Sequence, residues 1–220
     1  GVLANDVDGA PDGDTLTVSA TTISGTNGGT FTFEAGGALQ FAPGGAFDAL
    51  PLGATATTQA TYDALDGQGG RSSATVTITV SGVNEAPVLQ EDASTRSGAV
   101  FEDDATPTLH VQGSLSVTDA DTSDTATFTP TRGATTVTPT ASFTPRQALL
   151  DALDTALTIS PTGAWTFALD NTLTQDLGAG EAVTAPYDVT ISDTAGGAAS
   201  TTVTVTVSGV NDTPTASASD

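Results

Sequence analysis

The sequence contains the same strand-like segment twice, 127 positions apart. Residues 75–87 read TVTITVSGVNEAP and residues 202–214 read TVTVTVSGVNDTP, with ten of 13 aligned pairs identical. Alternation of β-branched and small polar residues with a period of two is typical of a strand with one buried face. Proline ends such a strand because it has no N–H to donate. Two copies of one strand and its exit predict a tandem array of similar domains.

Short strand-like segments separated by Gly and Asn clusters fill much of the remaining chain. They lie at residues 15–18, 30–34, 38–41, 55–62, 74–82, 108–112 and 114–118. Evenly spaced short strands with turn signals between them predict an all-β fold of two tandem antiparallel β-sandwiches. We expect domains at residues 1–87 and 88–214, and residues 215–220 are expected to start the next linker.

The second domain is expected to be longer than the first and to contain a short helix. The acidic loops at the two domain starts are 113 positions apart, whereas the domain ends are 127 apart, so the second domain has 14 additional residues inside it. Four leucines follow Pro145 at helical spacing, which places a helical insertion near residues 145–157. A buried leucine face is the ordinary role of such a helix, and binding of a partner is the alternative.

The charge balance restricts the partners of this chain. Asp and Glu number 26 against four Lys and Arg, for a net charge of −22. Binding of nucleic acid or of an anionic membrane surface requires clustered cations, so we expect neither. Cations are the natural partners of such a surface, and solubility alone is the alternative explanation. Cysteine is absent, which excludes disulfides, and no apolar run is long enough for a transmembrane helix.

The residue types needed for common enzyme sites are nearly missing. One histidine and no cysteine argue against Ser-His-Asp and Cys-His machinery, and no glycine-rich phosphate loop or zinc spacing is present. We therefore expect that this chain is not an enzyme. A continuous EF-hand loop is also excluded, because Asp124 and Pro130 stand where a loop starting at Asp119 needs Gly and Glu.

Oxygen-bearing side chains gather in the loop that opens the chain. Asn5, Asp6, Asp8, Asp12 and Asp14 lie within ten residues of a stretch rich in Gly and Pro. Asp and Asn favour turns, so an ordinary loop is one interpretation. Carboxylates this close together repel one another unless a cation neutralises them, and calcium prefers oxygen ligands of this kind. The loop is therefore a candidate calcium-binding segment.

Several short motifs occur in the order found in known repeat families. In the first half they are VLAND at residues 2–6, DGDTL at 12–16, DGQGG at 66–70 and VNEAP at 83–87. This half resembles the bacterial cadherin-like tandem repeats. In the second half they are FED at 101–103, VTDAD at 117–121, GAWTFALDN at 163–171 and LGAGE at 177–181. This half is similar to VCBS repeats. Both families occur in RTX adhesins, the large bacterial surface proteins exported by type I secretion.

The resemblance implies Ig/cadherin-like sandwiches with Ca²⁺ at the joint between domains. The ligands that it implies there are Asp66, Asn84 and Glu85 from the first domain and Glu102, Asp103, Asp119 and Asp121 from the second. Further ligands are implied at the other domain ends, namely Asn5, Asp6, Asp8, Asp14, Asp193, Asn211 and Asp212. Three features depart from the family pattern: Glu85 replaces the usual Asp, the insertion is atypical, and the first domain lacks its entry segment, which leaves Asp6 and Asp8 without their usual partners.

The function implied by the resemblance is a calcium-rigidified extender, or stalk, of a secreted surface adhesin that acts in cell adhesion and biofilm formation. Its expected partners are calcium ions, neighbouring repeats, and surface carbohydrate or protein. The alternative is a ligand-binding module of such an adhesin that recognises carbohydrate or peptide. That module would use Trp165 or the insertion, although a lone Trp is more often a core residue.

Overall fold

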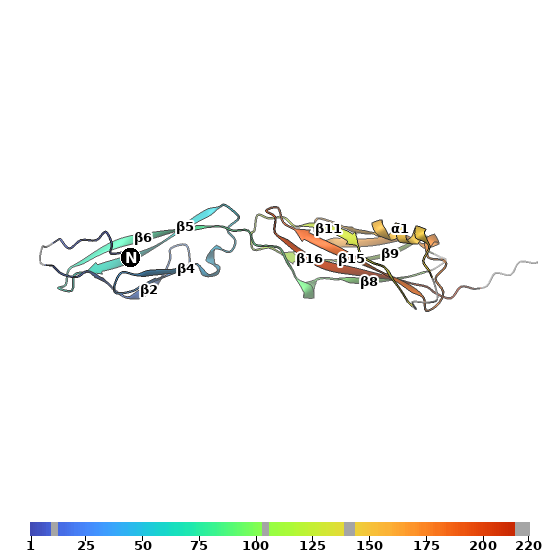
Figure 1. Ribbon diagram of the computed structural model, residues 1–220, viewed down its shortest axis with the longest axis horizontal. Coiled ribbons are helices and arrows are strands. Elements are labelled where there is room, and N and C mark those ends of the chain that lie inside the picture. The colour runs from blue at the N-terminus through green and yellow to red at the C-terminus, as the bar shows by residue number, and fades with distance from the viewer. Residues whose placement is uncertain (10–12, 103–105, 139–143, 214–220) are drawn as a thin grey trace, which may run out of the picture. The chain divides into compact units, whose positions relative to one another are not determined.

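The computed structural model describes residues 1–9, 13–102, 106–138 and 144–213 (Figure 1). The chain separates into two compact units. The first comprises Gly1–Glu85 together with Ala120–Ser123, and the second comprises Ala86–Asp119 together with Asp124–Asp220. Asp12, the expected ligand Asp103 and the expected linker at residues 215–220 lie outside the described residues.

The first unit consists of two three-stranded antiparallel sheets, with strand orders β1–β5–β6 and β2–β3–β4. The elements are β1 (Thr17–Val18), β2 (Thr21–Ser24), β3 (Thr30–Phe33), β4 (Leu39–Ala42), the 3-10 helix η1 (Gly44–Phe47), β5 (Thr55–Leu65) and β6 (Arg71–Ser81). Alternate residues of these strands point between the sheets. The buried core that they form is small and contains Val18, Phe31, Phe33, Ala60 and Tyr62.

The second unit has a five-stranded sheet, ordered β11–β15–β16–β8 with β12 also paired to β15, a three-stranded sheet ordered β13–β14–β9, and a separate β7–β10 pair. Its strands are β7 (Val88–Leu89), β8 (Ser97–Phe101), β9 (Thr108–Ser114), β10 (Val117–Thr118), β11 (Thr127–Arg132), β12 (Thr136–Thr138), β13 (Leu157–Ile159), β14 (Ala164–Asp170), β15 (Ala182–Ser192) and β16 (Ala198–Ser208). Its helices are η2 (Glu91–Ala93), α1 (Gln147–Ala156) and η3 (Asn171–Leu173). The all-β prediction is confirmed. One pairing differs from the expected antiparallel arrangement, since β8 pairs with β16 in parallel.

The repeat seen in the sequence is also a repeat of structure. The bounds of β15 and β16 equal those of β5 and β6 shifted by 127 positions. The pairing is shifted equally, with Thr55 opposite Ser81 in one hairpin and Ala182 opposite Ser208 in the other. A shared register places the same positions of both hairpins on the inner face of the sheet.

A glycine follows the repeated hairpin in both units, because a neighbouring backbone segment passes so close to this position that no side chain would fit. The Gly82 amide donates to the Ala54 carbonyl and the Gly209 amide to the Glu181 carbonyl, each at 2.9 Å. A Cβ at Gly82 would lie 2.2 Å from the Leu50 carbonyl oxygen, and one at Gly209 would lie 2.4 Å from the nearest backbone oxygen. Only glycine therefore fits either position without movement of the chain.

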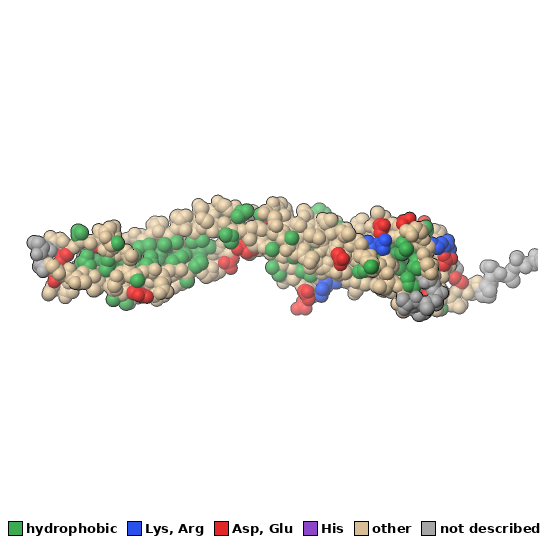
Figure 2. All heavy atoms as spheres, in the orientation of Figure 1, with side chains coloured by type: hydrophobic (Ala, Val, Ile, Leu, Met, Phe, Trp, Pro, Cys, Tyr) green, Lys and Arg blue, Asp and Glu red, His purple; other side chains and the backbone are tan. Residues whose placement is uncertain are grey.

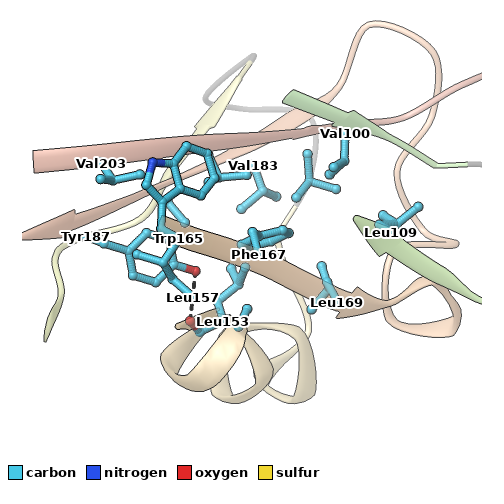
Figure 3. Packing of buried hydrophobic residues seen from close by; sticks show 14 of the residues in the cluster. Val100, Leu109, Leu153, Leu157, Trp165, Phe167, Leu169, Val183, Tyr187 and Val203 are labelled. Atoms are coloured by element: carbon cyan, nitrogen blue, oxygen red, sulfur yellow. Dashed lines mark hydrogen bonds between the residues drawn. The ribbon is translucent and has the colours of Figure 1, made fainter. Parts of the chain in front are cut away.

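The predicted helical insertion is confirmed as α1, and its leucine face is part of the core. Leu149 and Leu153 are fully buried, whereas Leu150 is partly exposed. The Tyr187 hydroxyl donates to the Leu153 carbonyl at 2.9 Å, which ties the helix to β15 (Figure 3). Burial raises the pKa of Tyr187 well above its ordinary value, so the hydroxyl remains a donor. Leu149 and Leu153 therefore have the core role that is ordinary for such a helix.

Candidate functional site

Asp66 forms a tight turn between β5 and β6. Its Oδ1 accepts the backbone amides of Gln68, Gly69 and Gly70 at 2.8, 3.0 and 2.8 Å. A Cβ at Gly70 would lie 2.0 Å from Asp66 Oδ2, so the carboxylate occupies the space of that side chain. These amides, that of Gln68 first, hold the pKa of Asp66 below its ordinary value. The turn thus favours the ionised carboxylate.

We expect Asp66→Asn to lower stability at neutral pH and to matter little in strong acid. A depressed folded-state pKa gives stability above the unfolded pKa of about 3.9 and loses it as pH falls through the folded value. Urea unfolding of the variant and the wild type, measured from about pH 7 to pH 2, should therefore give curves that converge on acidification. Asp92→Asn, an exposed acid outside the turns, is the charge-matched control. A difference that stays constant with pH would contradict the charge-based account.

The opening acidic loop and the Asp66 turn line one pocket of about 400 Å³ in the first unit. The predicted residues that border it are Asn5, Asp6, Asp8 and Asp66. Sequence reasoning missed Arg71, which also lines it and pairs with Asp63 at 2.7 Å. The pocket is therefore rich in oxygen donors but already has a cationic side chain at its border.

Tyr62 anchors the acidic loop to the sheet. Its hydroxyl donates to the Val2 carbonyl at 2.9 Å and to Asp6 Oδ2 at 3.1 Å. Partial desolvation and then the bond to Asp6 raise the pKa of Tyr62 above its ordinary value. Asp6 is thus held beside β5 by a neutral donor, and one oxygen of its carboxylate is already used within the unit.

The second unit repeats the aspartate turn. Asp193 Oδ1 accepts the amides of Ala195, Gly196 and Gly197 at 2.8, 2.6 and 2.8 Å, and the residue is 8% exposed. Asp124 accepts the Thr194 hydroxyl at 3.0 Å and so lies beside this turn. Asp124 was not among the predicted site residues. It begins the sequence DTATF, which is similar to the sequence DTLTV that begins at the predicted ligand Asp14, and this similarity could have identified it.

Three of the predicted ligands belong to the first unit near its C-terminal end. The Glu85 amide donates to Asp121 Oδ2 at 3.1 Å. Asp121 is only 1% exposed, whereas Asn84 and Glu85 are half-buried. Residues 120–123 are counted in this unit although they are far from Glu85 in sequence. The structure thus brings Asp121 to Glu85.

Glu102 is buried at the C-terminal end of the second unit. It is 1% exposed, and its Oε2 accepts the Val210 amide at 3.4 Å. Glu181, which sequence reasoning did not include, accepts the Gly178 amide at 2.9 Å and carries the carbonyl that binds Gly209. Of the remaining predicted ligands here, Asn211 and Asp212 are exposed.

No preformed metal centre is visible in the parts of the chain that the structure describes. Among these residues, no group of three or more acidic or histidine side chains lies close enough together to hold an ion. Asp14 is half-buried but does not line the acidic pocket. Asp119 is assigned to the second unit, whereas residues 120–123 are assigned to the first.

The described helices include none that is long and apolar enough to cross a membrane.

Trp165 is a core residue and not a ligand-stacking surface. Its side chain is 1% exposed, and its indole N–H donates to the Thr95 carbonyl at 2.7 Å. Figure 3 shows the ring packed within the second unit among Tyr187, Val183 and Val203. Trp165 is therefore not available as the contact residue of the alternative binding module.

Comparison with protein families matches residues 1–82 to the bacterial cadherin-like domain. No curated protein matches the chain significantly. The match supports a cadherin-like fold for this part of the chain, as the resemblance in the sequence implied. The match does not test the VCBS-like and RTX aspects of the resemblance.

Solved structures that the chain matches include segments of three cadherins. The EC1-2 structure of human mucin-like protocadherin is 16% identical with a TM-score of 0.43, covering 92% of this chain and 87% of that chain. Drosophila N-cadherin EC1-4 is 15% identical with a TM-score of 0.46, covering 89% and 41%. Protocadherin gamma B2 domains 1–5 are 15% identical with a TM-score of 0.45, covering 91% and 33%. The matches thus span less than half of each of the last two proteins.

Proposed function

We propose that this chain is a calcium-rigidified extender segment of a large bacterial surface adhesin, exported by type I secretion and acting in cell adhesion and biofilm formation. The observation that carries the proposal is the family match of residues 1–82 together with the recurrence of its C-terminal hairpin in β15 and β16. Cadherin-like domains are typically extracellular, non-enzymatic adhesion modules. A chain that repeats such a unit is suited to spanning distance rather than to chemistry.

The donor set is of the kind that calcium requires. Carboxylate and amide oxygens suit a hard cation that takes six to eight oxygen ligands. Asn84, Glu85 and Asp121 would hold one ion at the end of the first unit, and Asp6, Asp8 and Asp66 a second at its start. Because no three acids converge among the described residues, each ion would complete its shell with backbone carbonyls and water. The ion would supply a multidentate bridge between loops.

Burial of carboxylates supports a role for a cation. Asp121 and Glu102 are each 1% exposed in a chain with net charge −22. Burying a charged carboxylate costs free energy that a nearby cation can offset. Calcium, whose ligands in proteins are oxygens, is the cation that we propose for these carboxylates.

We expect calcium to raise the melting temperature of the chain. Extracellular modules bind calcium with Kd of about 10⁻⁴–10⁻³ M. At about 10 mM calcium, one site that exists only in the folded state then contributes about 1.4–2.7 kcal/mol. Thermal unfolding in chelator and in calcium measures this. Magnesium should substitute poorly, because it dehydrates reluctantly and demands tighter octahedral geometry. Equal melting temperatures in chelator and in calcium would overturn the proposal.

Variants separate a specific site from charge screening. Asp121→Asn should remove much of the calcium response while Asp92→Asn, which changes charge equally at an exposed position, should retain it. Calcium should also narrow the distribution of lengths in X-ray scattering, whereas added monovalent salt should not, because screening removes repulsion without bridging ligands. A calcium response reproduced by salt alone would identify the acids as a solubility feature.

A further inference from the structure

The larger sheet of the second unit contains a parallel pair of strands that come from opposite ends of the unit's sequence. β8 lies near the start of this unit and β16 near its end, and the register places Ser97 opposite Thr204 and Phe101 opposite Ser208. The other strand pairs among the described residues of this unit are antiparallel. Figure 1 shows β8 and β16 side by side. The pair thus joins the segment that enters the unit to the segment that leaves it.

Parallel pairing determines how tension on the chain acts on these strands. Tension pulls β8 from the residues before Ser97 and pulls β16 from the residues after Ser208. Because the two strands point in the same direction, these pulls are opposed along the strand axis and tend to slide one strand past the other. The hydrogen bonds of a parallel pair are evenly spaced, so such sliding strains all of them together. A pair that is pulled apart from one end breaks one bond at a time instead.

Hydrogen bonds at both ends of the pair resist sliding. At its start, the Thr204 amide donates to the Arg96 carbonyl at 2.9 Å. At its end, the Glu102 amide donates to the Ser208 carbonyl at 2.9 Å, and the Glu102 carboxylate accepts the Val210 amide at 3.4 Å. Five paired positions lie between these two ends. Sliding of either strand must therefore break bonds along the whole pair.

The residues at the start of β8 are also held by the other sheet and are shielded from water. The Thr95 amide donates to the Ser114 carbonyl, and the Thr95 carbonyl accepts the indole N–H of Trp165, each at 2.7 Å. Gly98 lies against the same ring, since a Cβ there would be 3.2 Å from it. Val207 on β16 is 0% exposed. Water therefore competes poorly for the hydrogen bonds of this region.

The ion pair beside β8 is less suited to bear tension than the backbone pairing. Arg96 pairs with Glu91 at 3.3 Å, and the two side chains are 41% and 68% exposed. Figure 2 shows arginine side chains beside acidic ones on the surface of the second unit. Exposed ion pairs contribute little because water and salt screen them. Resistance to tension is thus expected to come from the strands.

We propose that the β8–β16 pair is a shear clamp, a pair of strands whose hydrogen bonds share the load, which lets the second unit bear tension along the chain without unfolding. The unit stays folded until the pair ruptures as a whole. This inference goes beyond the proposed function, because the clamp lies within one unit and requires neither calcium nor an adhesin.

The test is single-molecule force spectroscopy of the 220-residue chain in chelator, so that the calcium proposal is not involved. The sequence has no cysteine, so two introduced cysteines are unique attachment points. Asp92→Cys with Thr213→Cys loads the pair in shear. Thr106→Cys with Thr213→Cys places both attachment points after the C-terminal ends of β8 and β16 and peels the pair apart. All three positions are exposed. We expect an unfolding force at least about twofold higher in shear than in peeling at equal loading rate.

Two proline variants separate the clamp from other contacts. Arg96 and Glu102 bond to β16, so by the alternation of a strand the Val100 amide faces β16 and the Ala99 amide faces away. Proline lacks this amide. In the shear arrangement, Val100→Pro should lower the unfolding force to near the peeling value. Ala99→Pro is the matched control and should retain most of the force, because proline is tolerated on an edge strand where its nitrogen faces away from the neighbouring strand.

The comparison of the two pulling directions does not depend on any proline variant being folded. Equal forces in shear and in peeling, or a higher force in peeling, would overturn the proposal, because the β8–β16 pair would then not determine resistance to tension. An equal loss of force in Val100→Pro and Ala99→Pro would also overturn it, because the hydrogen bonds to β16 would then not carry the load.

Discussion

Replacing Trp165 by alanine is expected to lower the unfolding free energy of the second unit by about 3–5 kcal/mol. The indole is 1% exposed, and its N–H satisfies the Thr95 carbonyl. Gly113 faces the ring so closely that a Cβ would lie 2.4 Å from it, so this neighbour has no side chain with which to fill a cavity. The substitution removes apolar contacts and also a hydrogen bond to a backbone carbonyl.

The internal repeat supplies the matched control. Leu39 on β4 and Trp165 on β14 occupy equivalent positions, because the two hairpins pair in the same register. Leu39 is partly exposed, so Leu39→Ala should cost the first unit much less. Hydrogen exchange resolved by unit measures the two effects separately. Equal losses in both units would contradict the assignment of Trp165 to a tightly packed core.

Leu153→Ala is expected to cost the second unit about 2–5 kcal/mol. Leu153 is 0% exposed on α1 and belongs to the core cluster that also contains Leu157 and Trp165 (Figure 3). Its carbonyl also accepts the Tyr187 hydroxyl, so movement of this turn of the helix would disturb β15 as well. Chemical denaturation followed by circular dichroism measures the loss.

Leu150→Ala on the same helix is the control, because Leu150 is partly exposed. Its effect should be well below that of Leu153→Ala, since less apolar area leaves water at this position. Tyr187→Phe should cost about 1 kcal/mol through loss of the hydrogen bond alone. If Leu153→Ala left stability unchanged, α1 would not be a core element and its role as a partner-binding helix would have to be reconsidered.

Local patterns in the sequence were sufficient for several elements. The period of two at residues 75–81 predicted β6, and the leucine spacing predicted α1, because both periodicities reflect one buried face. The Asp66 turn was also readable, since Asp followed by Gly is a local turn signal. Strand β11 was missed because it contains Pro130, which pairs with Val189 in the sheet. Proline is a residue type that argues against a central strand. Strand β8 was missed because SGAVF is short and weakly patterned.

The candidate site was predictable in residue type but not in arrangement. Asp66 and Asp193 were both among the implied ligands, and both form the same three-amide turn. The approach of Asp121 to the Glu85 amide joins residues 36 positions apart, and the presence of Arg71 in the acidic pocket depends on how β6 pairs. Contacts of this kind depend on tertiary packing, so neither acid clusters nor turn motifs reveal them. The ligand role of these residues stays a prediction.

Two nearly identical strands show where sequence ends and tertiary structure begins. The alternation in TVTITV of β6 and TVTVTV of β16 determined that both are strands and which side chains point inward. It did not determine burial, because Ile78 is partly exposed whereas Val205, its counterpart, is 0% exposed. That difference is decided by β8, which pairs with β16, and by β9 on the opposite sheet. Side-chain direction follows from the local backbone, whereas exclusion of water requires strands distant in the chain.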